Sequence, residues 1–206
     1  MKQTLFARSA PMALLAGGLA LALAGTAHAQ DASANRTAQG TYKIEPTHTF
    51  VTWEAKHFGT STSRGRFDRK DGTIEIDTAA KTGKAEISID MKSMNTGVAP
   101  FNTHLTSKDF FNAEEFPTAT FKGDQFKFDG DRVAEIAGSL TLLGKTHPVT
   151  LKASGFGCYM SPLIKRQICG GDFETTIARS QWGMTYGVPG IPDNIRLAIQ
   201  VEAIKQ

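Results

Sequence analysis

The chain has 206 residues, of which 40% are hydrophobic and 21% are charged, and its formal net charge is +3. This near balance of charges gives no electrostatic reason to expect a nucleic acid or an anionic membrane surface as a partner. After the N-terminal segment 1–29 no apolar run is long enough for a membrane helix, so we also expect no stable membrane insertion.

Segment 1–29 has the parts of a cleaved secretory signal peptide. Lys2 and Arg8 give a positive start, positions 12–25 are apolar, and Ala27-His28-Ala29 is a small-x-small cleavage site. A retained anchor is less favoured, because the apolar run is too short to span a bilayer and no cysteine follows it to carry a lipid. We therefore expect export to the periplasm.

The mature chain, 30–206, is long enough for one domain with a core. Cleavage removes only Lys2 and Arg8 from the basic side chains and none of the acidic ones. The charges of the mature chain therefore balance even more closely than those of the full sequence.

Cys158 and Cys169 are the two cysteines of the chain. The residues between them fit neither a CxxC redox motif nor a zinc knuckle, and exported proteins meet an oxidising compartment. We expect a disulfide in preference to a metal pair or a reactive thiol. On a chain-entropy estimate such a bridge contributes about 3 kcal/mol of stability.

In chain order, residues 30–40 are small and polar and predict a flexible lead-in to a single domain spanning residues 41–206. From there apolar and polar residues alternate in one segment after another, which is typical of strands with one buried face. Eight to ten such segments, separated by turn residues, predict an antiparallel barrel or sandwich.

Two turns stand out between these segments. Residues 69–72 (Arg-Lys-Asp-Gly) predict a hairpin turn that leads into the strand containing Ile74 and Ile76. Residues 138–151 predict a second hairpin, because two alternating runs flank Gly144 and Pro148. His147, which precedes Pro148, is interpreted as a turn residue of that hairpin.

Two stretches break the alternation. Residues 100–111 follow a period nearer to that of a helix. An aromatic cluster begins at the end of this stretch with Phe110 and Phe111 and continues to Phe116. Residues 179–186 predict a short helical turn. These are the candidates for one or two short helices outside the strands.

Motifs for catalysis or metal binding are missing from the sequence. It contains no G-x-S-x-G elbow, no Walker A motif and no H-E-x-x-H. His48 and His57 are separated by an odd offset, which would place them on opposite faces of one strand. We expect no enzyme activity, no metal and no other cofactor, although a metal site assembled from separate strands is an alternative.

The chain resembles the YceI-like family, often called polyisoprenoid-binding proteins, in four blocks that occur in order. These are Tyr42-x-Ile-x-x-x-His48-Thr with Phe58-Gly and Gly65-x-Phe67, Ile89-Asp to Phe121, Gly138 to Leu151, and Arg179-Ser-x-x-Gly183-Met-x-Tyr186 with Pro189 and Asp193. The resemblance implies a closed, lipocalin-like antiparallel barrel of about eight strands, with a lid of short helices. It also implies a bound lipid chain: an isoprenoid, a quinone-like molecule, or a fatty amide or acid.

By alternation within such a barrel, inward-pointing apolar residues should form the wall of the lumen. The expected wall residues are Trp53, Ala55, Phe67, Ile87, Ile89, Leu140, Leu142, Ile177, Leu197 and Ile199. Phe101, Leu105, Phe110 and Phe111 are the expected lid residues, and His48, His104, Arg179 and Trp182 are candidates for the polar end of the pocket.

Two other functions remain open from the sequence. One is a protein-interaction module whose barrel is filled by its own side chains, and the other is a histidine-based, metal-dependent enzyme. The oligomeric state, monomer or dimer, does not follow from the sequence.

Overall fold

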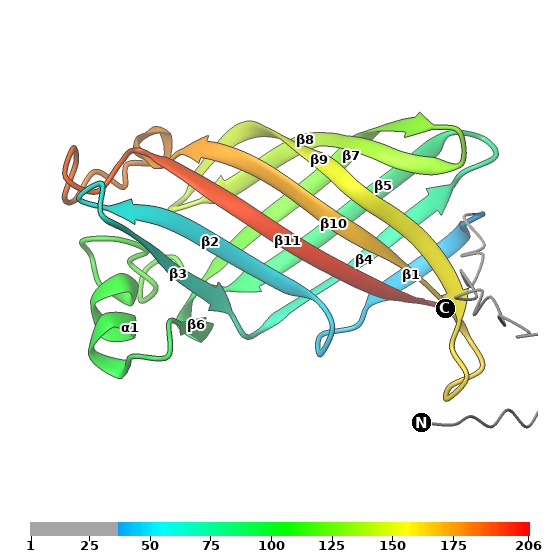
Figure 1. The fold of residues 1–206 in the computed structure, drawn as a ribbon, viewed down its shortest axis with the longest axis horizontal. Helices are drawn as coiled ribbons and strands as arrows, with labels where there is room; N and C mark the ends of the chain where they lie inside the picture. Colours follow the sequence, from blue (N-terminus) through cyan, green and yellow to red (C-terminus); the bar gives the residue numbers. More distant parts are fainter. Residues whose placement is uncertain (1–36) are drawn as a thin grey trace, which may run out of the picture. The chain divides into compact units, whose positions relative to one another are not determined.

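The computed structural model describes residues 37–206, so the predicted signal peptide and the first part of the lead-in lie outside the described residues. Within this range the chain forms a mostly β structure with one α-helix, α1 (Ala99–Thr106), and two short 3₁₀ helices, η1 (Met91–Ser93) and η2 (Arg179–Trp182) (Figure 1). The strands are β1 (Gln39–Ile44), β2 (Phe50–His57), β3 (Ser61–Phe67), β4 (Lys70–Asp77), β5 (Thr82–Asp90), β6 (Met94–Asn95), β7 (Thr118–Asp129), β8 (Arg132–Leu142), β9 (Lys145–Met160), β10 (Gln167–Ala178) and β11 (Asn194–Lys205).

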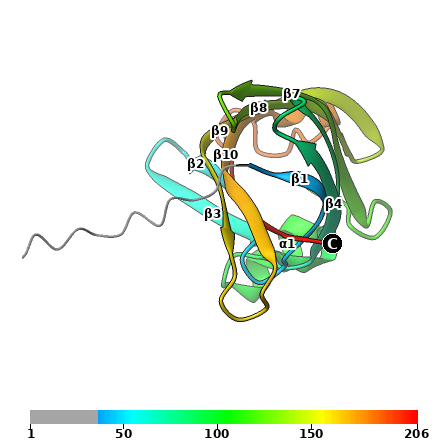
Figure 2. The same ribbon diagram turned by 90° about the vertical axis from the view of Figure 1, so that its right-hand side faces the viewer.

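Eight of these strands close into an antiparallel barrel in the order β1-β4-β5-β7-β8-β9-β10-β11, and β11 pairs back onto β1. Figure 2 shows this ring of strands end-on, with α1 at the far end. The structure thus confirms the predicted closed barrel. Closure leaves no long free edge in the ring, which removes the main route to edge-to-edge aggregation.

Strands β2, β3 and β6 widen one end of the barrel. The second half of β11 pairs with β1 (Lys205 opposite Tyr42), whereas its first half pairs with β2 (Leu197 opposite Trp53). β3 then pairs with β2, and β6 adds a short pairing to the edge of β3. The end that carries β2 and β3 is therefore built differently from the end that β1 closes.

The predicted hairpin of residues 138–151 is confirmed. Leu142 lies opposite Lys145, and the two loop residues, Leu143 and Gly144, have φ angles of 50° and 70°. Positive φ at both positions is what a two-residue hairpin turn with the twist of the flanking strands requires. The interpretation of His147 as a turn residue was wrong, since it lies within β9, opposite Leu140.

The predicted hairpin turn at residues 69–72 is also wrong. β3 and β4 do not pair with each other, because β3 lies beside β2 and β6 whereas β4 lies beside β1 and β5. The chain instead crosses from one part of the sheet to another, and Lys70 is buried at this crossing with its ammonium 4.9 Å from the centre of the Phe50 ring. A local turn signal does not reveal whether the strands on either side are neighbours.

Order begins earlier than the predicted domain boundary. β1 starts at Gln39, which pairs with Asp77, and Ala38 is completely buried beside Thr78. Backbone pairing with β4 orders this small, polar segment. The end of the predicted lead-in is therefore the first strand of the barrel.

The two irregular stretches both form helical turns. α1 buries Leu105, and Pro100 in its first turn is compatible with a helix start. η2 is followed by its C-cap residue Gly183, whose φ of 91° favours glycine.

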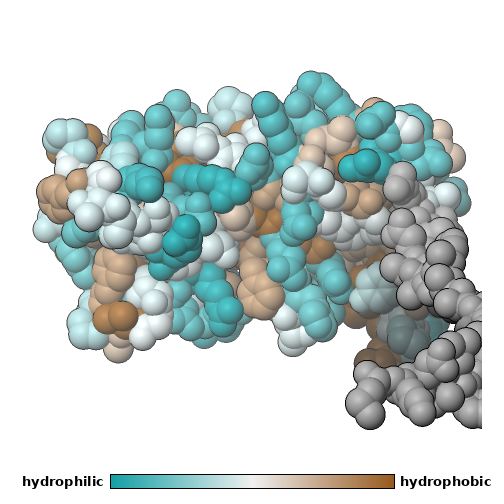
Figure 3. All heavy atoms as spheres, in the orientation of Figure 1, coloured by the Kyte–Doolittle hydropathy of each residue, from teal (hydrophilic) through white to brown (hydrophobic). Residues whose placement is uncertain are grey.

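The outer surface that faces the viewer in Figure 3 is mostly polar, as expected for strands that alternate between the core and solvent.

Cys158 and Cys169 form a disulfide between directly opposed positions of β9 and β10. The bridge is buried and closes the base of the β9–β10 hairpin, at the opposite end of the barrel from α1. The expected disulfide is thus confirmed.

Candidate ligand-binding cavity

The α1 end of the barrel is hollow. A cavity of about 680 Å³ lies there, which is within the usual range of about 300–1,000 Å³ for small-molecule sites. Its wall comes from β2, β3, β5, β7, β8, β10 and β11, and η1, α1 and the segments around residues 110 and 184–191 complete it. The cavity therefore lies where β2 and β3 widen the barrel.

Aliphatic and aromatic side chains dominate the cavity wall. The apolar lining residues are Val51, Trp53, Ala55, Phe58, Phe67, Ile89, Met91, Phe101, Leu105, Phe110, Phe111, Ala119, Leu140, Leu142, Ile177, Met184, Ile191, Ile195 and Leu197. Ala55 and Ala119 point small side chains into the barrel and leave space that a larger residue would fill. The wall is suited to an apolar guest.

Aromatic pairs hold the lid against the barrel. The ring of Trp53 on β2 meets Phe101 of α1 edge-on at 6.4 Å, and Phe67 on β3 meets Phe111 at 5.4 Å. The Trp53 indole also donates a hydrogen bond to the Met94 sulfur at 3.3 Å. Such ring pairs contribute about 0.5–1.5 kcal/mol each beyond their buried area, so the lid is fixed by packing.

A second group of rings joins α1 to the loop after η2. His104, Phe110 and Tyr186 lie within 5.1–5.2 Å of one another, centre to centre. The Nε2 atom of His104 also lies 3.0 Å from the Asp109 carboxylate. These contacts close one side of the cavity between two segments that are far apart in the sequence.

Arg179 organises the loop that forms this side of the cavity. Its side chain is buried, and its guanidinium donates to the backbone oxygens of Met184, Tyr186, Ile191 and Pro192 at 2.8–3.2 Å. Burial lowers the Arg179 pKa, which nearby Asp193 partly opposes. Arg179 therefore lines the cavity and also holds residues 184–192 in place.

Asp193 has a separate role next to Arg179. Hydrogen bonds from the Ser180 hydroxyl and backbone N–H, each 2.7 Å long, lower the pKa of its carboxyl. Asp193 thus accepts two hydrogen bonds from Ser180 in the first turn of η2, and its negative charge also acts on Arg179.

The cavity has polar groups at its mouth. Lys56 and His57 lie at the end of β2, Ser63 lies on β3, and all three line the cavity. Phe58, in the β2–β3 turn, is 68% exposed at this rim, where its ring packs over Gly190. The rim at this end is therefore more polar than the apolar wall behind it.

Comparison with known proteins identifies the family. A YceI-like domain matches residues 42–203. The chain belongs to the YceI-like domain family. UPF0312 proteins of Pseudomonas aeruginosa and Pseudomonas putida are 35% and 34% identical to it, over 95% and 94% of this chain and 97% and 96% of theirs. The resemblance seen in the sequence is thereby confirmed.

Several solved structures have a similar fold. BcnA of Burkholderia cenocepacia has a TM-score of 0.63 at 21% identity, covering 77% of this chain and 98% of BcnA. A YceI protein of Campylobacter jejuni has a TM-score of 0.62 at 24% identity, covering 73% and 90%. A polyisoprenoid binding domain from Saccharophagus degradans has a TM-score of 0.58 at 17% identity, covering 80% and 98%. These similarities show a shared YceI-like barrel.

The structure places most of the expected wall and lid residues in the lining of the cavity. They are Trp53, Ala55, Phe67, Ile89, Phe101, Leu105, Phe110, Phe111, Leu140, Leu142, Ile177 and Leu197. Ile199 does not line it, because it lies between Leu197, on the cavity wall, and Val201, which lines a separate void of about 40 Å³ in the other half. Ile87 does not line it either; its side chain packs against the opposite Gly72, with Cδ1 2.6 Å from the position that a Cβ on Gly72 would take.

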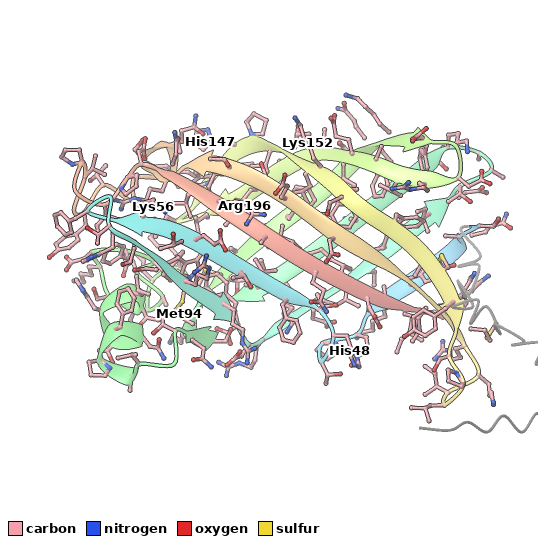
Figure 4. All side chains as sticks on the ribbon, viewed as in Figure 1. His48, Lys56, Met94, His147, Lys152 and Arg196 are labelled. Carbon is pink, nitrogen blue, oxygen red and sulfur yellow. A yellow bond between two sulfur atoms is a disulfide. The ribbon has the colours of Figure 1, made fainter. Side chains whose placement is uncertain are left out.

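Of the four polar-end candidates, His104 and Arg179 line the cavity and the other two do not. His48 is exposed in the β1–β2 turn, where its Nδ1 atom lies 2.6 Å from Glu45, and Figure 4 shows it well away from the α1 end. Trp182 is buried but does not line the cavity; its indole donates to the Leu140 oxygen and its ring lies 5.0 Å from that of His147. Both are structural contacts.

Several lining residues were missed from the sequence. Val51 and Ala119 follow the alternation and could have been included, as could Ile195 on β11. Met184, Tyr186 and Ile191 lie in an irregular loop and carry no periodic signal. Only the fold brings that loop to the cavity.

The described part of the chain, 37–206, shows neither a metal cluster nor a membrane helix. No three His, Cys, Asp or Glu side chains gather in this range in a way that could hold a metal ion. None of the helices in the same range has the length and apolarity needed to cross a membrane.

Proposed function

We propose that this YceI-like protein is exported and holds a long apolar chain in the hollow half of its barrel, as a carrier or sequestering protein without catalysis. The observation that carries the proposal is the apolar cavity of about 680 Å³ beneath an aromatic lid. The Saccharophagus degradans neighbour, a polyisoprenoid binding domain, supports the same use of the fold.

The energetics of burial agree with this proposal. Each buried CH₂ group contributes about 0.8 kcal/mol, whereas association costs on the order of 4–15 kcal/mol. A chain of about twenty carbons therefore offsets even the upper cost. The cargo would be an isoprenoid, a quinone-like molecule, or a fatty amide or acid.

The proposed export rests on segment 1–29, which lies outside the described residues. The buried disulfide is consistent with an oxidising compartment such as the periplasm. Intact-mass measurement of protein from the periplasmic fraction should give a chain that starts at Gln30. A chain that keeps segment 1–29 and stays in the cytoplasm would contradict export.

The test of lipid binding is extraction of the native protein. Protein purified without detergent or delipidation is extracted with organic solvent, and the extract is analysed by mass spectrometry beside an extract of the same host without the protein. We expect a long-chain lipid at a near-stoichiometric level. An extract that matches the control would overturn the proposal.

The rival functions receive less support. An interaction module with a filled barrel does not fit the hollow α1 end, although the tip of the β9–β10 hairpin exposes apolar side chains, with Leu163 89% exposed. A histidine-based enzyme would need convergent polar groups around His48, His57 or His104. His48 lies away from the cavity, and the two lining histidines share no acceptor or donor.

A further inference from the structure

The loop of the β9–β10 hairpin exposes large apolar side chains. Leu163 is 89% exposed, Met160 is 64% exposed and Ile164 is 46% exposed. The hairpin extends away from the ring of strands, past the C-terminal end of β11, at the end of the barrel opposite α1 (Figure 1 and Figure 2). Exposed apolar side chains that gather beside polar ones are typical of a protein or membrane contact.

Hydrogen bonds and the disulfide fix the shape of this loop. The backbone N–H of Ser161 donates to the Arg166 oxygen at 2.9 Å, and that of Lys165 donates to the Ser161 oxygen at 3.0 Å. The disulfide between Cys158 and Cys169 joins the two strands just before the loop. The apolar side chains are therefore presented at the tip by a closed turn.

The loop also carries positive charge without an acid beside it in the sequence. Residues 155–171 contain no aspartate or glutamate, whereas Lys165 and Arg166 are both exposed in the loop. Neither of these two side chains has a hydrogen-bond or ion-pair partner within the described part of the chain. Glu202 on β11 lies at the base of the hairpin, where it accepts a hydrogen bond from the Tyr159 hydroxyl. The charge balance of the whole chain thus does not hold at this tip.

The size and chemistry of the tip favour a membrane surface over a protein partner. A stable protein interface takes about 20–30 residues from each side, whereas this tip is a single short loop. Aliphatic side chains followed directly by Lys165 and Arg166 match the layers of a bilayer surface, because the apolar groups reach the acyl chains while the long cationic side chains stay at the phosphates. Anionic phospholipids would supply the counter-charge that the protein lacks here.

Two other features of the protein do not offer the same fit. Residues 30–36 (Gln-Asp-Ala-Ser-Ala-Asn-Arg) have no large apolar side chain with which to cover the tip. At the α1 end Tyr186 is also exposed, but its ring packs against His104, which lies 3.0 Å from the Asp109 carboxylate. Negative charge next to the exposed ring makes that end less suited to an anionic surface.

We propose that the β9–β10 loop is a membrane-contact site that rests on anionic phospholipid, with Leu163, Met160 and Ile164 at the level of the acyl chains and Lys165 and Arg166 at the phosphates. The contact is peripheral and reversible, since only a few side chains enter the lipid. This inference goes beyond the proposed function, because it concerns the end of the barrel opposite the cavity.

The test measures how the mature protein, with its disulfide intact, partitions onto lipid vesicles. Vesicles of phosphatidylglycerol and phosphatidylcholine in equal amounts are compared with vesicles of phosphatidylcholine alone. Each cation near an anionic surface strengthens binding about fivefold, so we expect the two cations to favour the anionic vesicles at least about tenfold. Added salt should weaken this preference.

A matched pair of variants tests the apolar part of the tip. Leu163→Ser should weaken binding to the anionic vesicles at least about tenfold, because it removes the most exposed apolar side chain of the loop. Val98→Ser, which removes another exposed apolar side chain just before α1, should leave vesicle binding unchanged. Thermal unfolding of both variants confirms that they fold.

A second pair tests the cations. Lys165→Gln should weaken binding to the anionic vesicles about fivefold and leave binding to neutral vesicles unchanged. Lys152→Gln, elsewhere on β9 and away from the loop in Figure 4, should change neither. An equal loss in both variants would mean that net charge, and not the loop, attracts the protein, and would contradict the assignment.

The remaining outcomes separate this inference from its rivals. No binding of the wild type to anionic vesicles, or unchanged binding of Leu163→Ser, would overturn it. A wild type that sediments as a dimer and a Leu163→Ser variant that sediments as a monomer would assign the tip to a second copy of the chain and also overturn it. None of these results affects the carrier function, since lipid extraction tests the cavity at the other end.

Discussion

The two halves of the barrel share four continuous strands, β7, β8, β10 and β11, but one half is hollow and the other is filled. The α1 half contains the cavity of about 680 Å³, whereas the half closed by β1 and the disulfide contains a void of only about 40 Å³. β8, β10 and β11 contribute to the lining of both spaces, as does β7. Alternation alone therefore does not decide whether a barrel is open.

The difference comes from which side chains and strands close each half. In the filled half, Tyr42 from β1 and the rings of Phe126 and Phe173 point into the lumen. In the hollow half the inward positions include Ala55 and Ala119, and the large rings pack between the wall and the lid. Aromatic rings thus fill the lumen in one half, whereas in the other half they pack between the wall and the lid and leave the lumen open.

The largest expected effect compares two leucines. Leu151 and Leu142 are 8% and 7% exposed, but only Leu142 lines the cavity. Leu151→Ala should lower the free energy of unfolding by about 3 kcal/mol, because it opens a new void in a packed core. Leu142→Ala should cost clearly less in lipid-free protein, since one side of that residue already lacks packing partners.

Urea unfolding of both variants, after removal of lipid, provides the measurement. Equal losses of stability would mean that the α1 half is packed as tightly as the other half in solution. That result would contradict the comparison between the two halves.

The disulfide provides the next effect. Replacing both Cys158 and Cys169 by alanine should lower the free energy of unfolding by about 3 kcal/mol, the chain-entropy estimate for a loop of this length. Because the bridge lies at the filled end, the amount of extracted lipid per folded protein should stay the same. A variant that folds but loses its lipid would show that the two ends are coupled.

The same enlargement should have different effects in the two halves. Ala203→Leu, beside the small void, should destabilise the protein by about 1–3 kcal/mol through overpacking. Ala119→Leu, on the cavity wall, should be tolerated and should reduce lipid binding. Thermal unfolding and lipid titration of both variants test this pair, and similar destabilisation by both would argue against a hollow half.

The smallest effect concerns the turn that links β1 of the filled half to β2 of the hollow half. Burial raises the pKa of Glu45, but hydrogen bonds from Thr47 and His48 outweigh it and lower the pKa to about 2. These bonds run from the backbone N–H and side chain of each residue to the carboxylate. The lowered pKa means that the folded state prefers the ionised form more than the unfolded state does.

The contribution of ionised Glu45 to the free energy of unfolding is therefore complete above the usual pKa of 4.5 and is lost as the pH falls toward about 2. Glu45→Gln should cost about 1–2 kcal/mol at neutral pH and should flatten the fall in stability between about pH 5 and pH 2. Urea unfolding of both proteins across this range provides the measurement. An unchanged dependence of stability on pH in Glu45→Gln would contradict the role of Glu45. Glu135→Gln serves as the control, because Glu135 on β8 is also a paired carboxylate, with Lys127 as its partner.

The sequence predicted those parts of the fold that depend on local patterns. Alternation gave the strands, Gly144 marked a true hairpin, and the two cysteines were correctly paired. The turn signal at residues 69–72 failed, because strand neighbours in a barrel depend on closure over long sequence distances. The start of β1 was missed because its small polar residues are ordered by pairing with β4.

The cavity could be predicted only in part, for a related reason. Strand and lid residues such as Trp53 and Phe101 were found from their period and aromatic character. The height of a residue along the barrel, which separates Leu197 from Ile199, depends on strand tilt and has no sequence signal. The loop of Tyr186 reaches the cavity through Arg179, a contact that sequence spacing does not reveal.

The most direct test of the central claim uses the two tryptophans of the chain. Trp53 lines the cavity, whereas Trp182 is buried outside it. A bromine-labelled fatty acid, whose bromine quenches only rings that it contacts, should strongly quench the fluorescence of the lipid-free wild-type protein and only weakly quench that of Trp53→Phe. Equal quenching in both proteins, or none in the wild type, would contradict the placement of an apolar chain in the hollow half.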